Sequence, residues 1–193
     1  MEIRKQNLEP DCFYHIYNRG VNGEKTFLVD ENYKFFLSKV NLFLSPVCDI
    51  YAYCLMPNHF HFLVKVKSEK DFSEELKLKA FKTNGLHSYD SIISKQISKL
   101  ISSYSQAFNR FNKVRSGNLF ESPFKRLKIE NEEYLRNVLI YIHQNSLSLH
   151  PDLEKYKYSS YKDILLNDNF LVKTQNVIEL FDDLDNFKLN HNK

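Results

Sequence analysis

The segment that most constrains the fold of this chain of 193 residues is 56–66, which reads MPNHFHFLVKV. Aromatic and β-branched residues that follow a Pro-Asn turn signal are typical of a β-strand. Successive side chains of a strand point to opposite faces. The segment therefore predicts a core strand whose apolar face is formed by Phe60, Phe62, Val64 and Val66.

The other face of this strand begins with His59 and His61, followed by Leu63 and Lys65. Two residues on one strand face lie roughly 7 Å apart along the backbone, so the two imidazole rings can converge on one ion. Histidine is the commonest metal ligand. A second interpretation is that one histidine caps a turn and the other is a surface residue. The spacing alone leaves both interpretations open.

Composition excludes several classes of function. Only four glycines are present, which argues against a Gly-rich phosphate loop, and no apolar run approaches the roughly 20 residues that span a bilayer. The N-terminal sequence MEIRKQNLEP lacks the apolar region of a signal peptide. The three cysteines are odd in number and have no CxxC spacing. Reduced thiols and a cytoplasmic location are expected.

Basic residues concentrate in the segment 92–130, which holds eight of them and only two acidic residues. Such a segment is expected of a protein that binds a polyanion. The alternative is a solvated helix face. The candidates for contacts to the phosphates of such a partner are Arg19, Lys95, Lys99, Arg110, Lys125 and Arg126.

The hydrophobic periodicity predicts alternating strands and helices. Strands are expected at 12–18, 47–55, 59–66 and 124–129, and helices at 31–44 and 92–112. This order, βαββαβ, predicts an α+β fold of the ferredoxin-like type, with helices on one face of an antiparallel sheet. A further helix is expected from the cap at Asn131 to about residue 145, and a short one near 176–187. Residues 1–150 would form the main domain, and 151–193 a C-terminal extension that packs on it or trails it.

Several stretches together resemble a known family. The hairpin YAYCLMPNHFHFLVKV resembles the His-hydrophobe-His (HUH) motif of single-tyrosine transposases. YHIYNRGVNGEKTF, SYSQAFNRFNKVRSGNLFESPFKR and YIHQNSLSLHPDLEKYKYSSY resemble the branch of REP-associated tyrosine transposases. The resemblance covers roughly residues 12–163. HUH alone is a weak signal, whereas these motifs in this order are a specific combination.

The resemblance implies an enzyme that nicks and rejoins single-stranded or hairpin DNA. His59 and His61 would bind Mg²⁺ or Mn²⁺, which would polarise the scissile phosphate. Tyr104, on the long helix, would be the nucleophile and form a covalent 5′-phosphotyrosine. The competing interpretation of Tyr104 is a core residue, because it lies on the apolar stripe of its helix. A ring packed on the sheet could still aim its hydroxyl at the histidines.

The third metal ligand is the weakest part of this site. Many single-tyrosine relatives have a polar ligand four residues after the nucleophile. Here that position is Phe108, which has no ligand atom, so Asn109 is the candidate. The sequence is compatible with a homodimer and with a monomer. Two other functions remain open: a non-cleaving protein that binds DNA or RNA hairpins, and a metal phosphodiesterase that uses water instead of tyrosine.

Overall fold

The computed structural model describes residues 6–77, 89–113, 117–168 and 171–192. Four strands form one antiparallel sheet in the order β2-β3-β1-β4. Their bounds are Phe13–Arg19 for β1, Cys48–Met56 for β2, His59–Val66 for β3 and Lys125–Ile129 for β4. The first and third strands are central, so the predicted α+β, ferredoxin-like order of strands is confirmed.

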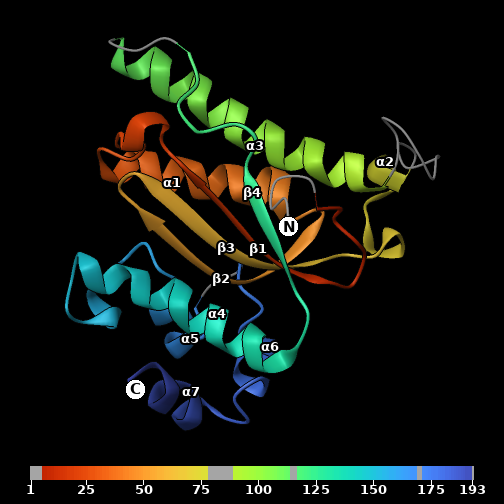
Figure 1. The fold of residues 1–193 in the computed structure, drawn as a ribbon, viewed down its shortest axis with the longest axis vertical. Helices are drawn as coiled ribbons and strands as arrows, with labels where there is room; N and C mark the ends of the chain where they lie inside the picture. Colours follow the sequence, from red (N-terminus) through yellow and green to blue (C-terminus); the bar gives the residue numbers. More distant parts are fainter. Residues whose placement is uncertain (1–5, 78–88, 114–116, 169–170, 193) are drawn as a thin grey trace.

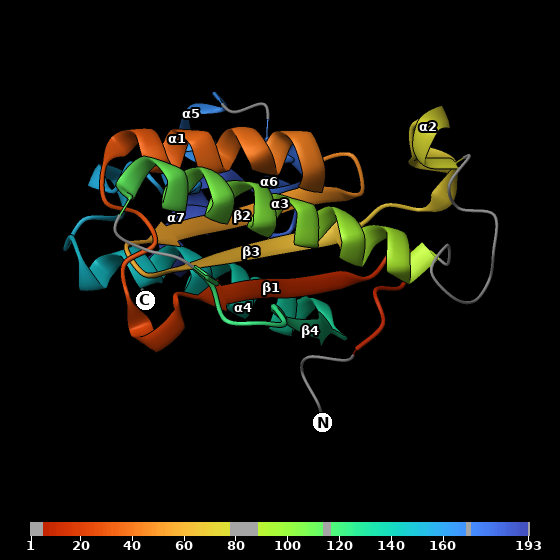
Figure 2. The ribbon, with the colours of Figure 1, turned by 90° about the horizontal axis from the view of Figure 1, so that it is seen from above.

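Helices α1 (Asp30–Lys39) and α3 (Tyr89–Asn112) lie side by side on one face of the sheet (Figures 1 and 2). A π-helical turn, Val40–Leu44, prolongs α1 to the end predicted for this helix. Phe36 of α1 packs against Phe60 and Phe62 of β3, with ring centroids 5.1 and 6.3 Å away. The predicted apolar face of β3 is therefore the core face beneath α1 and α3.

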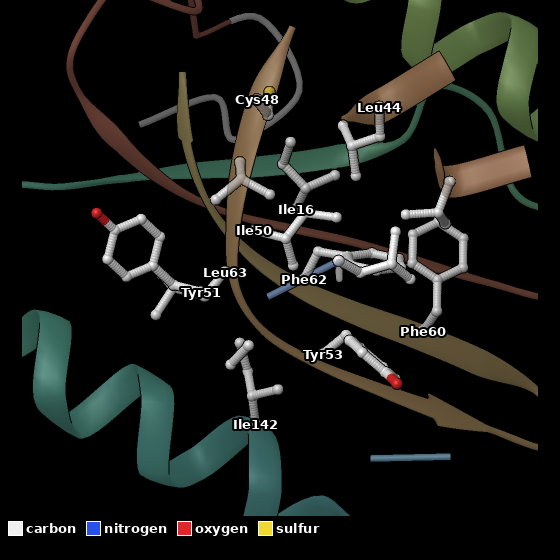
Figure 3. Packing of buried hydrophobic residues seen from close by; sticks show 14 of the residues in the cluster. Ile16, Leu44, Cys48, Ile50, Tyr51, Tyr53, Phe60, Phe62, Leu63 and Ile142 are labelled. Atoms are coloured by element: carbon white, nitrogen blue, oxygen red, sulfur yellow. The ribbon is translucent and has the colours of Figure 1, made fainter. Parts of the chain in front are cut away.

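The opposite face of the sheet is covered as well, which differs from the expected one-sided arrangement. Helix α4 (Glu132–Gln144) begins at its predicted cap, where the Asn131 side chain accepts a hydrogen bond from Tyr134 N at 2.8 Å. It crosses beneath the strands on the side away from α1 and α3 (Figure 1). Its Leu135, Val138, Leu139 and Ile142 are buried. Figure 3 shows Ile142 projecting from α4 into the packed interior. The amphipathic helix after β4 thus builds a second layer by burying its apolar stripe.

The turn between β2 and β3 is held in place by the loop after β1. Pro57 O accepts hydrogen bonds from the backbone of Thr26 and Phe27, at 2.8 and 3.0 Å, and Asn58 O accepts one from Gly20 N at 2.8 Å. A Cβ atom on Gly20 would lie 2.1 Å from the backbone oxygen of Glu24. A glycine is therefore required where this loop passes the hairpin, directly beside the first histidine.

Residues beyond 150 pack along the outer edge of β2. Leu55 N and Ser160 N donate to backbone oxygens across this edge, and Lys173 N donates to Ile50 O. The remaining short helices are α2 (Glu74–Lys77), α5 (Tyr161–Leu166), α6 (Thr174–Glu179) and α7 (Leu184–His191). The single helix predicted near 176–187 is thus two helices, because Asp182 adopts a positive φ of 69° and Asp183 caps α7. No described helix is long and apolar enough to cross a membrane.

A chain of buried hydrogen bonds joins α4 to this C-terminal segment. His143 of α4 lies 2.8 Å from Ser160 Oγ through Nε2 and 2.8 Å from His191 Nε2 through Nδ1. His191 Nδ1 lies 2.8 Å from Phe187 O, which can only accept. His191 therefore donates to Phe187, His143 donates to His191, and the Ser160 hydroxyl donates to His143. Burial lowers the pKa of both imidazoles, so both rings are neutral at pH 7, and the chain fixes α4 against α7.

Candidate active site

The face of the sheet that carries His59 and His61 is the one that α4 covers. In the antiparallel register, His59 is opposite Arg19 and His61 is opposite Tyr17, so these side chains share one face. Lys125 of β4 is opposite Tyr17 and joins the same face. Phe60 and Phe62 point the other way, to α1. The predicted alternation along β3 is therefore present, with the histidines together on one side.

His59 is oriented by its neighbour in the turn. Its Nδ1 lies 2.6 Å from Oδ1 of Asn58, whose Nδ2 donates to Gly23 O at 3.2 Å. Because this amide presents its oxygen to the ring, His59 carries its proton on Nδ1, and its Nε2 keeps a lone pair. Burial, and secondarily the positive charge of Arg19, lower the pKa of His59. A neutral ring with a bare Nε2 is the form that binds a metal ion.

His61 is held by a second histidine that motif reasoning missed. His61 Nδ1 lies 2.8 Å from Nε2 of His15, and the two rings stack at 5.0 Å. Both side chains are buried, with exposed fractions of 6 and 7%. Burial lowers the pKa of His15 to about 4 and that of His61 to about 2. Both rings are therefore neutral at pH 7, and the rings of His59 and His61 meet edge to face at 5.0 Å.

Tyr141 of α4 brings a phenol to this face. Its ring centroid lies 5.7 Å from that of His61 and 6.1 Å from that of His15. The residue is 51% exposed, so the ring lies at the surface and is not enclosed by the core. One turn later, at the residue that caps the C-terminus of α4, Asn145 Nδ2 donates to Tyr141 O at 2.7 Å. The helix that faces the histidines thus carries the tyrosine near its end and an amide at its C-cap.

The donor atoms fit a divalent ion with open coordination positions. Each of His59 and His61 uses Nδ1 within the protein, which leaves the two Nε2 atoms for an ion. Metal-binding histidines usually have their second ring nitrogen engaged in this way. The described residues contain no group of three His, Cys, Asp or Glu side chains that could hold a metal. Further ligands would therefore have to be an amide such as that of Asn145, or water.

Tyr104 does not lie beside the histidines, which corrects the expected geometry. It is buried between α1 and α3, with an exposed fraction of 1%, and its ring contacts Phe36 at 5.0 Å. Its hydroxyl donates to Thr26 O at 2.5 Å. Burial raises its pKa above the ordinary value of 10. The sheet separates this phenol from His59 and His61, so the core interpretation describes Tyr104.

The expected third ligand and part of the expected DNA surface also lie on the face of the sheet that α1 and α3 cover. Asn109 is on α3, where its amide donates to Gly117 O at 2.9 Å, away from the histidines. Arg126 is buried against α3, donating to Ser94 Oγ at 2.6 Å with Asp90 at 3.9 Å. These positions follow from the side of the sheet on which α3 runs, which the periodicity of α3 does not reveal.

The six basic candidates therefore divide between two faces. Arg19 and Lys125 flank the histidines, whereas Lys95, Lys99 and Arg110 are exposed on α3. Lys125 pairs with Glu121 at 3.1 Å and lies 5.8 Å from the centre of the Tyr17 ring. Tyr17 stacks in turn on His15 at 4.7 Å. A row of aromatic and basic side chains thus borders the histidine pair.

One signal in the sequence could have found Tyr141. The stretch YIHQNS contains a tyrosine followed at the fourth position by an asparagine, which is the spacing that the resemblance to single-tyrosine transposases leads us to expect. Tyr104 has Phe108 at that position. For His15, no spacing in the sequence predicts a contact, because 46 residues separate it from His61 and only strand pairing brings them together.

Comparison with known proteins supports the fold. No family model matches the chain, and no curated protein matches it in sequence. The solved structure of a REP-associated tyrosine transposase bound to a REP hairpin is similar, with a TM-score of 0.55 and 15% identity over 90% of each chain. The tRNA(His) guanylyltransferase of Saccharomyces cerevisiae is more distantly similar, with a TM-score of 0.46 and 12% identity over 96% of this chain and 78% of that one. The chain therefore has a fold like that of the REP-associated tyrosine transposases.

Proposed function

We propose that this protein is a metal-dependent enzyme that nicks and rejoins single-stranded DNA next to a hairpin, with Tyr141 as its nucleophile. The observation that carries the proposal is the position of the exposed Tyr141 ring beside the buried His61 ring, on the face opposite Tyr104. The similar fold of a transposase that was solved with a REP hairpin supports hairpin DNA as the substrate class.

In this proposal, His59 and His61 hold Mg²⁺ or Mn²⁺ through their Nε2 atoms, with Asn145 as the candidate amide ligand. A bound divalent ion would act as a Lewis acid on the scissile phosphate. Arg19, opposite His59 in the register, would bind a phosphate oxygen. Lys125 would contact the neighbouring phosphate backbone of the DNA strand. In this arrangement, Arg19 and Lys125 bind the DNA backbone at and beside the phosphate that the Tyr141 phenol attacks.

The chemical step is a transesterification at phosphorus. The Tyr141 hydroxyl gives up its proton, its oxygen forms a bond to phosphorus, and the bond from phosphorus to the 3′ oxygen breaks. The 3′ oxygen takes up a proton and becomes a free hydroxyl, while the 5′ phosphate stays on the tyrosine. Attack by a 3′ hydroxyl reverses the step and joins strands. The number of phosphoester bonds is unchanged, so no external energy source is needed.

The test compares two tyrosines that lie on opposite faces of the same sheet. Wild-type protein, Tyr141→Phe and Tyr104→Phe are incubated with labelled hairpin DNA that carries a single-stranded flank, in the presence of Mn²⁺. A denaturation-resistant protein–DNA adduct is expected for the wild type and for Tyr104→Phe, and none for Tyr141→Phe. Tyr141 is half exposed, so its variant should remain folded.

Three results would contradict the proposal. An adduct that persists in Tyr141→Phe would exclude this nucleophile. Multiple turnover without any adduct would favour a phosphodiesterase that uses water. Tight hairpin binding that survives chelation, without cleavage of any single-stranded substrate, would favour a non-cleaving protein that binds DNA or RNA hairpins.

A further inference from the structure

We propose that His15 is a positioning residue that holds His61 in the tautomer and ring orientation needed to bind the divalent ion. The inference rests on the proposed metal site. It adds a third histidine to that site, from a different strand, and gives it a function through His61 and not as a ligand.

The geometry gives His15 a supporting role at this site. Its Nε2 lies 2.8 Å from Nδ1 of His61 and is thereby used within the protein. The two rings are nearly parallel, at 27°, so His15 braces the plane of the His61 ring as well as its nitrogen.

The direction of this hydrogen bond decides whether His61 can bind an ion. A neutral imidazole has one proton, so an Nε2 lone pair on His61 requires a proton on Nδ1. That proton is then donated to Nε2 of His15, which must carry its own proton on Nδ1. Asn58 does the same for His59 by accepting from its Nδ1. Both proposed ligands thus have an acceptor behind them, one an amide and one an imidazole.

His15 is itself fixed by its surroundings. Its ring stacks on Tyr17 at 4.7 Å and 28°, and the ring of Tyr141 meets it edge-on at 6.1 Å and 75°. The side chain is buried on the central strand β1, next to the strand that carries His61. A residue held this firmly can impose an orientation on its partner. Loss of such outer partners typically weakens metal affinity about 10- to 100-fold.

The chain contains a matched control for this bond. His143 and His191 form a second buried histidine pair with the same nitrogen-to-nitrogen distance of 2.8 Å, between α4 and α7. Replacing His191 removes a bond of the same chemistry and length from outside the proposed metal site. An effect that follows the loss of any buried histidine pair can therefore be separated from an effect on the metal ligand.

The experiment measures Mn²⁺ affinity by titration at pH 7.5 for the wild type, His15→Phe, His15→Gln and His191→Gln. We expect the dissociation constant of His15→Phe to rise by roughly 10- to 100-fold. His15→Gln should recover part of the affinity, because its amide oxygen can accept from His61 Nδ1. His191→Gln leaves His59, His61 and their hydrogen-bond partners in place, so it should lose much less affinity than His15→Phe.

A second readout uses the metal-free protein with ¹⁵N-labelled histidines. NMR should find the His61 proton on Nδ1 in the wild type and a mixture of tautomers in His15→Phe. A wild-type spectrum with this proton on Nε2 overturns the inference, even if His15→Phe fails to fold. If the wild type binds Mn²⁺ and His15→Phe binds it with the same affinity, only the role of His15 is overturned. Absence of Mn²⁺ binding by the wild type overturns the metal site and the inference together, whereas Mn²⁺ binding without a DNA adduct overturns the proposed nucleophile alone.

Discussion

At the scale of single residues, Tyr104 and Tyr141 differ in their surroundings. Tyr104 and Tyr141 both lie on long helices, but one is enclosed by aromatic rings and the other borders solvent. Burial raises the pKa of the Tyr104 phenol, so its neutral form is favoured where it donates to Thr26 O. A buried phenol with a satisfied hydroxyl stabilises a core. A nucleophile must instead reach its substrate.

Replacing Tyr104 by phenylalanine is expected to lower the free energy of unfolding by about 1 kcal/mol, because the buried hydrogen bond to Thr26 O is lost. Urea denaturation of the two tyrosine variants measures this. Tyr141→Phe serves as the control and should unfold close to the wild type, because the described residues include no partner for its hydroxyl and half of its side chain is exposed. Equal losses in both variants would contradict the assignment of one tyrosine to the core and the other to the site.

At the scale of elements, α4 decides what the histidine face can do. The helix begins where Asn131 accepts from Tyr134 N, and its buried stripe packs on the sheet. At its other end, the hydrogen bonds of His143 fix it to Ser160 and His191. A helix that packs on the sheet and is hydrogen-bonded at its C-terminal end can hold Tyr141 at a constant distance from the histidines. The C-terminal segment thus contributes to the site through α4, without contributing a ligand.

Loss of the cap should loosen the first turn of α4. Asn131→Ala is expected to reduce the free energy of unfolding by about 1 kcal/mol, since the Tyr134 amide loses its acceptor. Asn131→Asp keeps an acceptor oxygen and adds a favourable charge at the helix N-terminus. It should therefore unfold at the same denaturant concentration as the wild type or at a higher one. Chemical denaturation of the three proteins checks the order. An alanine variant as stable as the aspartate variant would show that packing alone holds this end.

At the scale of the whole molecule, the sheet divides the positive charge into two surfaces. Arg19 and Lys125 border the histidines, and Lys99 lies on α3, on the opposite side of the sheet. Because the proposed substrate binds at the histidines, Arg19→Gln and Lys125→Gln should weaken hairpin binding, each with a salt dependence that is shallower by about one phosphate contact. Lys99→Gln should change neither the affinity for the hairpin nor its salt dependence. Measurement of affinity over a salt series would contradict this if Lys99→Gln had the largest effect.

Acid stability should also report on the whole fold. Burial lowers the pKa of His191 to about 4, although a backbone contact with Phe187 acts the other way, and burial next to His191 lowers that of His143. The unfolded chain takes up a proton near pH 6.5 that the folded chain refuses until about pH 4. Stability from His191 is therefore present above pH 6.5 and is lost as the pH falls from 6.5 to 4.

The expected loss from His191 between pH 7 and pH 5 is about 2 kcal/mol. Urea unfolding at both values measures the total change, to which the other buried histidines contribute. His191→Gln cannot titrate there, so its loss should be smaller than that of the wild type by about this amount. Asp152, Glu154 and Lys188 line the cavity beside His191 and remain in both proteins. An identical pH dependence in the two proteins would contradict a neutral, buried His191.

The sequence by itself determined the four strands, the long helix and the cap at Asn131, because alternation, helical periodicity and capping are local patterns that need no distant partner. It also placed His59 and His61 on one face of a strand, which is a matter of parity alone. Only the tertiary structure decided which helix faces that pair. An amphipathic helix buries its stripe equally well on either side of a sheet, so α3 and α4 could not be assigned from their own residues. Strand pairing likewise brought His15 to His61, and that contact between distant segments completes the arrangement around the histidine pair.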